Sequence, residues 1–395
     1  MLLFLFWFFG IPAALMALYS VRTGKRYLEH VEGSLRNSSE PFTPPVSLIV
    51  PVKGLDYDLA SNLRSLAQQD YPDYELLIVC SNVSDEALRV ARSTLNPHSR
   101  VITAGDPPEH TGEKIHNLLE AVKLARPESE VFVFADSDGQ VGPAWLRALV
   151  APLQEESVGA ATGFRWYFPE HGGFWPLLRS VWDSTVATSM RDDDRNFAWG
   201  GGTAIRRSTF EEARVAEFWR GAVSDDYRLT KALNEAKLGI EFVPGAMVAT
   251  TGDCSAGEFL RWATRQLVIT KVYRGGLWWA GLAAHIAYCG AILTSLVLLA
   301  SGDPLGLGGL IVTVVPGMGK GSMRAYAARL MFPGREDWLD HFGWAYFWMT
   351  PIATWIWLYV FYRSALTRTI EWRGNVYELV SAEQIRCVAS QTSSK

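Results

Sequence analysis

A chain of 395 residues has room for one large domain or two smaller ones, and a formal net charge of −4 argues against a nucleic-acid partner. Hydrophobic residues make up 49% of the chain, with 16 tryptophans, which is high for a soluble enzyme. The excess lies at the two ends of the chain, so we expect an integral membrane protein. The cysteines have no paired or metal-ligand spacing, which predicts free thiols in a reducing compartment: Cys80, Cys254, Cys289 and Cys387.

Residues 1–21 predict an N-terminal transmembrane anchor. Leu2 to Tyr19 carry no charge. Basic residues follow at once: Arg22, Lys25 and Arg26. Because the basic residues come after the apolar stretch rather than before it, we expect an uncleaved anchor with its basic end in the cytoplasm. Residues 22–43 end in a polar, proline-rich run and are expected to form a linker.

Residues 44–262 alternate between strand and helix patterns. Apolar runs predict strands over 46–50, 74–80, 101–102 and 131–135. Apolar residues at helical spacing predict helices between them, over 59–66, 87–95 and 114–124. This alternation is typical of an α/β domain with a mostly parallel sheet and helices on both faces. We expect a cytoplasmic domain flanked by transmembrane helices.

Asp136-Ser137-Asp138 directly follows the apolar strand 131–135. Such a strand is covered on both faces, and ligands bind at the carboxyl edge of open α/β sheets. Two carboxylates one residue apart suit a divalent cation that carries phosphate oxygens. The pattern recurs at Asp56/Asp58 and Asp192/Asp194, but only the copy at 136 follows such a strand. The alternative for Asp138 is a helix cap or a turn residue.

Further motifs occur in order along the chain: Pro51-Val52-Lys53-Gly54, Lys114-Ile115-His116-Asn117-Leu118, Asp225-Asp226-Tyr227 and Arg261-Trp262. Together with Asp136-Ser137-Asp138, they make the chain resemble the family 2 inverting glycosyltransferases, in particular the ceramide glucosyltransferase branch. Bacterial hopanoid-associated glycosyltransferases are similar to that branch. The resemblance extends to the Glu371-Trp372-Arg373-Gly374 tail. It implies a GT-A-like nucleotide-diphospho-sugar transferase domain.

The resemblance implies roles for single residues. Asp226 would be the general base that deprotonates the acceptor hydroxyl, and Asp136 and Asp138 would hold Mg²⁺ or Mn²⁺ on the diphosphate of a UDP-sugar. Asp136 would thereby also contact the donor. The other donor-binding residues would be Pro51, Lys114, Arg261, Trp262 and, for the base, Asn82 or Asp85. The acceptor side would include Gly201, Gly202 and Asp225.

Two positions depart from the family pattern. Glu258 stands where Gln or Arg is usual, and Asn82 stands where an acid contacts the uracil. Asp85 would take over that contact or would only cap the next helix. Plainer interpretations also exist for the other residues. Asp226 would be a first-turn helix acid, and Lys114 a solvated lysine. Arg261-Trp262 would be an interfacial anchor, and the 200–202 glycines a flexible turn.

Residues 263–395 predict a C-terminal membrane region with a short tail. Residues 277–302 and 342–362 are each long and apolar enough to span. Residues 304–319 would reach only about 24 Å at ~1.5 Å per residue, less than a ~30 Å bilayer core, so a short or re-entrant segment is expected. The side on which the tail lies stays open, because the loop before 342 and the tail after 362 are both basic.

These observations favour a membrane-bound enzyme, in the bacterial inner membrane, that moves one hexose from a UDP-sugar such as UDP-glucose to a lipid hydroxyl such as that of ceramide. Inversion is expected because the sequence offers a single base and no covalent nucleophile. The alternatives are transfer of N-acetylglucosamine from its UDP-sugar to a hopanoid lipid, a processive polysaccharide synthase on the same fold, and a non-catalytic membrane scaffold.

Overall fold

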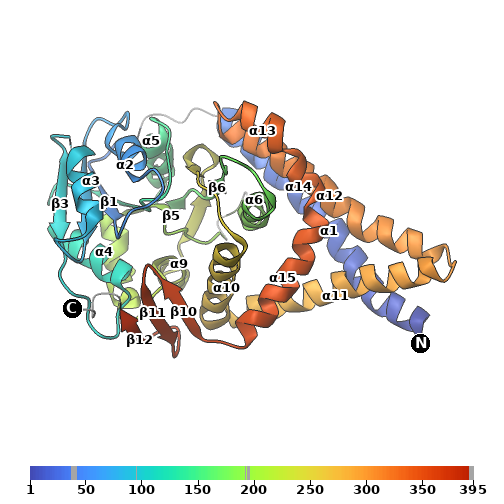
Figure 1. Cartoon of the computed structure of the whole chain (residues 1–395). Coiled ribbons are helices and arrows are strands. Elements are labelled where there is room, and N and C mark those ends of the chain that lie inside the picture. The colour runs from blue at the N-terminus through green and yellow to red at the C-terminus, as the bar shows by residue number, and fades with distance from the viewer. Residues whose placement is uncertain (37–41, 95, 192, 194–195, 391–395) are drawn as a thin grey trace. The chain divides into compact units, whose positions relative to one another are not determined.

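The computed structural model describes residues 1–36, 42–94, 96–191, 193 and 196–390. Part of the predicted linker (37–41), Leu95 at the end of a predicted helix, and Asp192 and Asp194 of the third Asp-x-Asp copy lie outside them. The chain divides into two compact units (Figure 1). The α/β unit comprises residues 33–167, 190–252 and 369–395, and the helical unit comprises 1–32, 168–189 and 253–368.

A seven-stranded mixed sheet forms the centre of the α/β unit, in the order β3-β2-β1-β4-β7-β5-β8. The strands are β1 (Val46–Pro51), β2 (Tyr74–Cys80), β3 (Ser99–Thr103), β4 (Val131–Ala135), β5 (Val158–Thr162), β7 (Gly202–Arg206) and β8 (Gly239–Phe242). β7 runs antiparallel to both of its neighbours, and the remaining pairs are parallel. The predicted α/β class with a mostly parallel sheet is confirmed.

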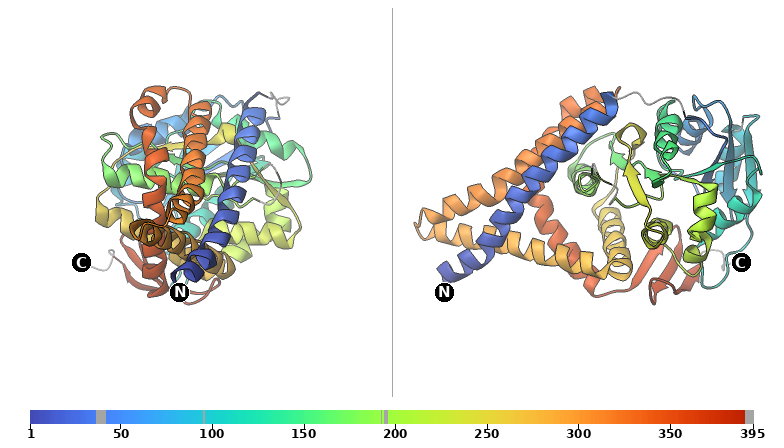
Figure 2. Two further views of the ribbon diagram at one scale, coloured as in Figure 1. Left: turned by 90° about the vertical axis from the view of Figure 1, so that its right-hand side faces the viewer. Right: turned by 180° about the vertical axis from the view of Figure 1, so that it is seen from behind.

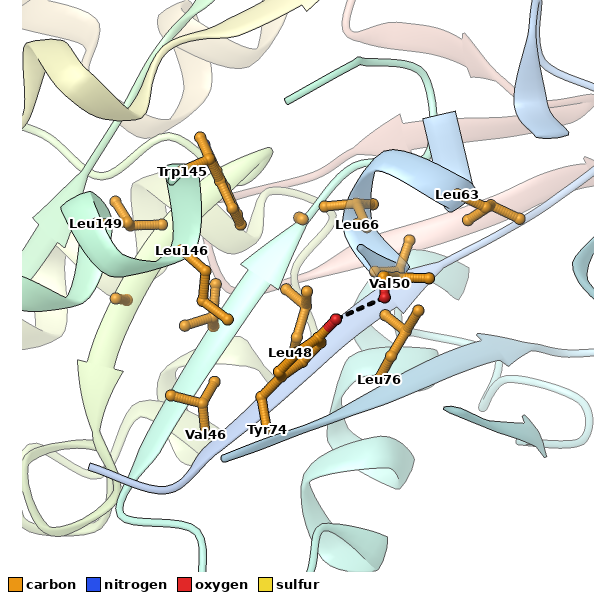
Figure 3. Packing of buried hydrophobic residues seen from close by; sticks show 14 of the residues in the cluster. Val46, Leu48, Val50, Leu63, Leu66, Tyr74, Leu76, Trp145, Leu146 and Leu149 are labelled. Carbon is orange, nitrogen blue, oxygen red and sulfur yellow. Dashed lines mark hydrogen bonds between the residues drawn. The ribbon is translucent and has the colours of Figure 1, made fainter. Parts of the chain in front are cut away.

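Strands β1, β2 and β4 are buried on both faces, which explains their mainly apolar sequences. Figure 3 shows one side of this core, where alternate β1 residues (Val46, Leu48 and Val50) pack with apolar residues of the neighbouring helices. The Tyr74 hydroxyl, at the start of β2, donates a 2.7 Å hydrogen bond to the Ala67 carbonyl. The buried phenol is thereby satisfied within an apolar cluster.

The helices of this unit alternate with the strands along the chain. They are α2 (Leu59–Ala67), α3 (Glu86–Thr94), α4 (Glu113–Leu124), α5 (Trp145–Val150), α7 (Arg207–Glu212), α8 (Val215–Trp219) and α9 (Asp225–Glu235). The first three helices match the predicted ranges closely. A short parallel pair, β6 (Arg165–Tyr167) and β9 (Val248–Thr250), forms a second small sheet. No sequence pattern predicted β5 to β9.

The C-terminal residues form a three-stranded antiparallel sheet, β10 (Thr369–Trp372), β11 (Asn375–Leu379) and β12 (Ile385–Ser390). This sheet belongs to the α/β unit. The predicted short tail of the membrane region covers these residues and does not describe them. β11 alternates between buried and half-buried residues, with Tyr377 and Leu379 buried, and this period of two is that of a strand rather than of a tail.

The helical unit contains α1 (Leu2–Arg36, up to Glu32), α6 (Phe174–Ala187), α10 (Ala256–Tyr273), α11 (Gly275–Ala300), α12 (Leu305–Met331), α13 (Glu336–Phe342), α14 (Trp344–Trp348) and α15 (Thr350–Ala365). Figure 2 shows α1 running alongside α12. A Cβ added at Gly24 of α1 would lie 3.1 Å from the Lys320 side chain, so a small residue permits this close approach.

The helical unit departs from the predicted membrane segments in several places. Within the described residues, α1 and α11 are the helices long and apolar enough to cross a membrane, by length and composition. α1 continues to Arg36, so residues 22–36 of the predicted linker are helical. α12 continues to Met331, so 304–319 is part of a longer helix: the apolar run ends at Lys320, but the helix does not.

Residues 342–362 do not form one spanning helix, contrary to prediction. α14 ends at Trp348, and α15 begins at Thr350. Pro351 lies in the first turn of α15, where its missing N–H and fixed φ are compatible with a helix start but not with a helix interior. The predicted catalytic range 44–262 is likewise not continuous, because α6 and the first turns of α10 belong to the helical unit.

Candidate active site

The acidic residues of the site gather where the direction of strand order changes. β1 is flanked by β2 on one side and by β4 on the other, so the chain leaves the carboxyl ends of β1 and β4 toward opposite sides. In open α/β sheets this switch point forms the ligand crevice. Asp56 lies in the loop after β1, and Asp136 and Asp138 lie directly after β4.

Asp136 and Asp138 converge on one guanidinium. Nη2 of Arg165, on β6, lies 3.0 Å from Oδ2 of Asp136 and 2.6 Å from Oδ1 of Asp138. Nη1 of Arg165 donates a 2.9 Å hydrogen bond to Oδ2 of Asp138, so the pair with Asp138 is bidentate. The guanidinium also lies over the Trp199 ring, 5.2 Å from its centroid. The two carboxylates therefore already surround a single cationic group.

Lys114 connects the two acidic motifs. It lies in the first turn of α4, and its Nζ is 2.9 Å from Oδ1 of Asp136 and 3.1 Å from Oδ2 of Asp225. It also donates a 3.3 Å hydrogen bond to the Gly200 carbonyl. The side chain is largely buried, so the alternative of a solvated surface lysine does not describe it.

Asp225 and Asp226 begin α9 and differ in exposure. Asp225 is 4% exposed and bound to Lys114, whereas Asp226 is half-buried. Oδ1 of Asp226 accepts hydrogen bonds from the Ser224 hydroxyl and, at 2.7 Å, from the Tyr227 N–H. Ser224 caps the helix, as its hydroxyl accepts from the Tyr227 N–H. Asp226 therefore has the contacts of a first-turn helix acid and is also accessible.

Burial and the charges of their neighbours shift the pKa values of Asp225, Lys114 and Asp136. Burial raises the pKa of Asp225 to about 6, and the neighbouring carboxylates of Asp226 and Asp136 act in the same direction against Lys114. For Lys114, burial lowers the pKa, but Asp136 and Asp225 more than offset this and raise it overall. For Asp136, burial raises the pKa, but Lys114 and Arg165 outweigh it and lower it overall. Lys114 therefore stays charged at neutral pH.

Asp56 is a third acid of the site, although its Asp-x-Asp copy does not directly follow a strand. Its side chain is 7% exposed. Oδ2 of Asp56 accepts a 2.6 Å hydrogen bond from the Ser137 hydroxyl, and Oδ1 lies 2.5 Å from Nη1 of Arg373. Burial raises the pKa of Asp56 although Arg373 acts against this. Ser137, between the predicted metal ligands Asp136 and Asp138, thus links the loop after β4 to the loop after β1.

The glycines after Trp199 are required by space. A Cβ added at Gly200 would overlap with Oδ2 of Asp225, and one added at Gly201 would lie 2.7 Å from Oδ2 of Asp136. The Asp136 N–H points to the Gly201 carbonyl at 3.4 Å. Gly202 begins β7 and faces the Trp199 ring. The predicted close approach of this backbone is therefore an approach to the acids of the site.

The two candidates for the base contact have different surroundings. Asp85 accepts hydrogen bonds from the Gly54 N–H at 2.9 Å and from the Ala87 N–H at 2.9 Å, so it caps α3 and also fixes the loop after β1. Asn82 is exposed, and its Oδ1 accepts from the N–H and the hydroxyl of Ser84. Pro51 ends β1, at the same edge of the sheet.

Arg261 and Trp262 belong to the helical unit, on α10. Arg261 is exposed, and Trp262 is half-buried with its ring centroid 6.1 Å from that of Phe259. Glu258, which departs from the family pattern, forms a capping box with Ser255 at the start of α10. The departure at 258 therefore has a local role in helix capping.

Sequence reasoning missed three residues of the site: Asp56, Arg165 and Arg373. Asp56 had a signal, since it follows the buried strand β1 after a short loop. Arg165 had none, because it lies on a three-residue strand. Arg373 stands in the Glu371-Trp372-Arg373-Gly374 motif, to which the resemblance gave no role in the site. His116, inside a family motif, faces the Ala104 carbonyl at 3.1 Å.

The predicted metal ligands suit a cation that they share with a substrate. Oxygens of Asp136 and Asp138 approach the same nitrogen atom, so the two carboxylates form a convergent hard-oxygen donor pair. Among the residues that the structure describes, no three His, Cys, Asp or Glu side chains are grouped to hold a metal by themselves. Mg²⁺ characteristically takes one or two carboxylates and completes its shell with phosphate oxygens and water. The residues present fit that arrangement.

Comparison with known proteins identifies the class. The family model of Glycosyl transferase family 21 matches residues 2–385, and the chain belongs to this family. It is thus a glycosyltransferase, as predicted, and the GT-A-like fold class agrees with the family and with the strand order of the sheet.

Two relatives carry the same description. Ceramide glucosyltransferase 1 of Caenorhabditis elegans is 25% identical over 207 residues, covering 49% of this chain and 43% of that protein. Ceramide glucosyltransferase of Komagataella phaffii is 29% identical over 93 residues, covering 22% of this chain and 18% of that protein. The matched segment thus spans less than half the length of each relative.

Solved structures of similar fold include two glycosyl-transferring enzymes. A mannosyltransferase from Pyrobaculum calidifontis, in complex with GDP-Man and Mn²⁺, is 16% identical with a TM-score of 0.48, covering 88% of this chain and 98% of that chain. Glucosyl-3-phosphoglycerate synthase from Mycobacterium tuberculosis, in complex with Mn²⁺, UDP-glucose and phosphoglyceric acid, is 17% identical with a TM-score of 0.39, covering 62% of this chain and 81% of that chain.

Proposed function

We propose that this protein is a membrane-bound, inverting glycosyltransferase that moves one hexose from a UDP-sugar, such as UDP-glucose, to a lipid hydroxyl, such as that of ceramide. The observation that carries the proposal is the chain of contacts from Asp138 through Arg165, Asp136 and Lys114 to Asp225. It connects the proposed metal ligands to Asp225, the neighbour of the proposed base Asp226, and this supports one site at the switch point of the sheet.

Asp226 is proposed as the general base. Being half-buried and held at the start of α9, it would accept the proton of the lipid hydroxyl. The hydroxyl oxygen would then bond to the anomeric carbon as the bond from that carbon to the UDP oxygen breaks. A single displacement of this kind inverts the anomeric configuration. The neighbouring Asp225 is buried and paired with Lys114, which makes it the poorer base.

The cations of the site would stabilise the departing UDP. Lys114 and Arg165 are charged and in contact with the acids at which the diphosphate would bind. A divalent cation, Mg²⁺ or Mn²⁺, held by Asp136 and Asp138 would supply further neutralisation of the diphosphate. Arg165 occupies the space between these carboxylates here, so donor binding would transfer its guanidinium from the acids to the phosphate oxygens.

A lipid acceptor is supported by the candidate spans and by the relatives. α1 and α11 are long and apolar enough to cross a membrane, and the matched relatives carry the description ceramide glucosyltransferase. The basic residues after the N-terminal apolar run favour a cytoplasmic catalytic domain, in a bacterial inner membrane. Arg261 and Trp262 are proposed to contact the donor or the lipid from α10.

Purified membranes containing the full-length protein, supplied with radiolabelled UDP-glucose and ceramide, test the proposal. We expect label to appear in a monoglycosylated lipid. Asp226→Asn should abolish this transfer while UDP binding persists. Glu235→Gln is a matched control, because Glu235 is an exposed acid at the other end of the same helix. Transfer by Asp226→Asn at the wild-type rate would contradict the assigned base.

A further inference from the structure

The turn between β10 and β11 holds an arginine in an unfavourable backbone conformation. Arg373 and Gly374 form a two-residue hairpin loop between paired Trp372 and Asn375. Their φ values are 51° and 77°, so both are left-handed. This is the φ pattern of a type I′ turn, in which Asn and Gly are favoured at the first position, whereas a long side chain there is disfavoured. Such outliers persist where the surroundings hold them, and they cluster at ligand sites.

The Arg373 side chain reaches the acids of the site. Its Nη1 lies 2.5 Å from Oδ1 of Asp56 and donates a 3.4 Å hydrogen bond to the Lys53 carbonyl. Asp136 and Asp138 also act on its charge. The side chain nevertheless stays 36% exposed. Part of the guanidinium is thus available to a ligand while Asp56 holds the rest.

The C-terminal sheet is fixed to the α/β unit beside this arginine. Asn375 donates a 2.5 Å hydrogen bond to Oε2 of Glu113, in the first turn of α4, and the Tyr377 hydroxyl accepts a 3.3 Å hydrogen bond from the Glu113 N–H. At the other end of the sheet, Glu383 lies 3.4 Å from Nη1 of Arg228 and 3.3 Å from Nζ of Lys231. These contacts fix the sheet whose hairpin tip carries Arg373, next to Asp56 and the Lys53 carbonyl in the loop that follows β1.

We infer that Arg373 is a donor-binding residue that contacts the diphosphate of the nucleotide-sugar, and that Asp56 is the residue that orients it. The inference rests on the proposed function, which supplies the diphosphate. A guanidinium held on one edge by a buried carboxylate presents its remaining N–H groups in a fixed fork, which matches phosphate oxygens. The C-terminal sheet thereby contributes a functional group to a site that is otherwise built from the central sheet.

Calorimetric titration of the full-length protein with UDP and with UMP, in the presence of Mg²⁺, tests this inference. Arg373→Gly suits the left-handed φ, and this gain partly offsets the cost of leaving the buried Asp56 carboxylate without its guanidinium, so this variant should still fold. We expect it to weaken UDP binding by about tenfold to a hundredfold, the loss of a charged hydrogen-bond donor, and to leave UMP binding nearly unchanged. Arg373→Lys should bind UDP with intermediate affinity, since it keeps the charge and loses the fork.

Two further variants separate this role from that of a mere counter-ion. Asp56→Asn should weaken UDP binding in the presence of Arg373, and the double variant Asp56→Asn/Arg373→Gly should bind UDP as poorly as Arg373→Gly. If Arg373 only neutralises Asp56, the double variant should recover wild-type affinity, and this would overturn the inference. Arg386→Ala, which removes an exposed arginine paired with Glu378 on the same sheet, is the control and should bind UDP normally.

The two proposals fail separately. Wild-type affinity for UDP in Arg373→Gly would overturn the role of Arg373 and leave the glycosyl transfer intact. A wild-type protein that binds neither UDP nor UDP-glucose would overturn the proposed function, and the inference with it. Equal loss of UDP and UMP binding would assign Arg373 to the general shape of the site and would also contradict a diphosphate contact.

Discussion

The carboxyl ends of β1 and β4 lie side by side at the switch point of the sheet, and the acids that follow them differ in burial and in their arginine partners. After β4, Asp136 and Asp138 follow the strand at once and share Arg165 between them. After β1, Asp56 lies further along the loop, is more deeply buried and pairs with Arg373. We propose that the acids after β4 exchange a cation with the substrate, whereas the acid after β1 holds an arginine in place. We therefore expect chemistry to depend on the β4 end and positioning to depend on the β1 end.

The largest expected effect is at the β4 end. Asp138→Ala should lower the transfer rate by about a thousandfold, because a cation held at a leaving group contributes several kcal/mol to its stabilisation. The rate is measured with radiolabelled UDP-glucose over a range of Mn²⁺ concentrations. A variant that keeps the wild-type rate and the wild-type Mn²⁺ dependence would break the comparison between the two strand ends.

Two glycine variants compare the cost of steric overlap with the cost of a positive φ. Gly201→Ala should destabilise the fold by about 1–3 kcal/mol, since the added Cβ meets Trp199 and Asp136 with little room to shift. Gly54→Ala, in the β1 loop, meets open space and carries only the cost of its φ of +64°, about 1 kcal/mol. Urea unfolding of both variants measures this order, and a larger loss in Gly54→Ala would reverse it.

The pH dependence of stability tests the buried acid that Lys114 links to Asp136. The pKa of Asp225 is raised to about 6 in the fold. An unfolded chain releases this proton near pH 4, so between about pH 4 and pH 6 the stability should fall by about 1.4 kcal/mol per pH unit. The contribution is fully present below this window and lost above it. Asp225→Asn should remove this slope from the unfolding curves, and an unchanged slope would show that Asp225 ionises normally in the fold.

The smallest effect is expected at the β1 end. Asp56→Asn should lower the transfer rate by only about tenfold, because it acts through the orientation of Arg373 and not on the reacting atoms. The effect should appear mainly in the KM for UDP-glucose. A loss as large as that of Asp138→Ala, or a loss in kcat alone, would place Asp56 among the acids that bind the donor directly.

The parts of the fold that sequence could predict are those with a strong apolar pattern. Strands β1, β2 and β4 are buried on both faces, so Val46–Pro51 and Val131–Ala135 are recognisable as apolar runs, together with the acids that follow the second of them. Strands such as β6 and β9 span three residues each, which is too short for any periodicity. The predicted span 342–362 is wrong because hydropathy does not register the helix break between Trp348 and Thr350.

The residues of the candidate site likewise divide into those that sequence motifs predict and those that they do not. Lys114, Asp136, Asp225 and Asp226 stand in ordered motifs and were predicted together, and the structure brings them into contact or adjacency. Arg165 was not predictable, since an isolated arginine has no local signature and its partner is fixed only by tertiary folding. Arg373 stands in a motif of the resemblance, but its contact with Asp56 is likewise fixed only by tertiary folding. The third aspartate, Asp56, was set aside because a loop separates it from its strand, although that loop returns it to Ser137.

The central claim is that this site transfers one sugar to a lipid with inversion. Full-length protein in membranes, given UDP-glucose and ceramide with Mn²⁺, should produce a monohexosylceramide by mass spectrometry, and proton NMR of the isolated lipid should show a β-glucosidic linkage from the α-linked donor. A polymeric product, an α-linked product, or no lipid product while UDP-glucose is bound would contradict the claim.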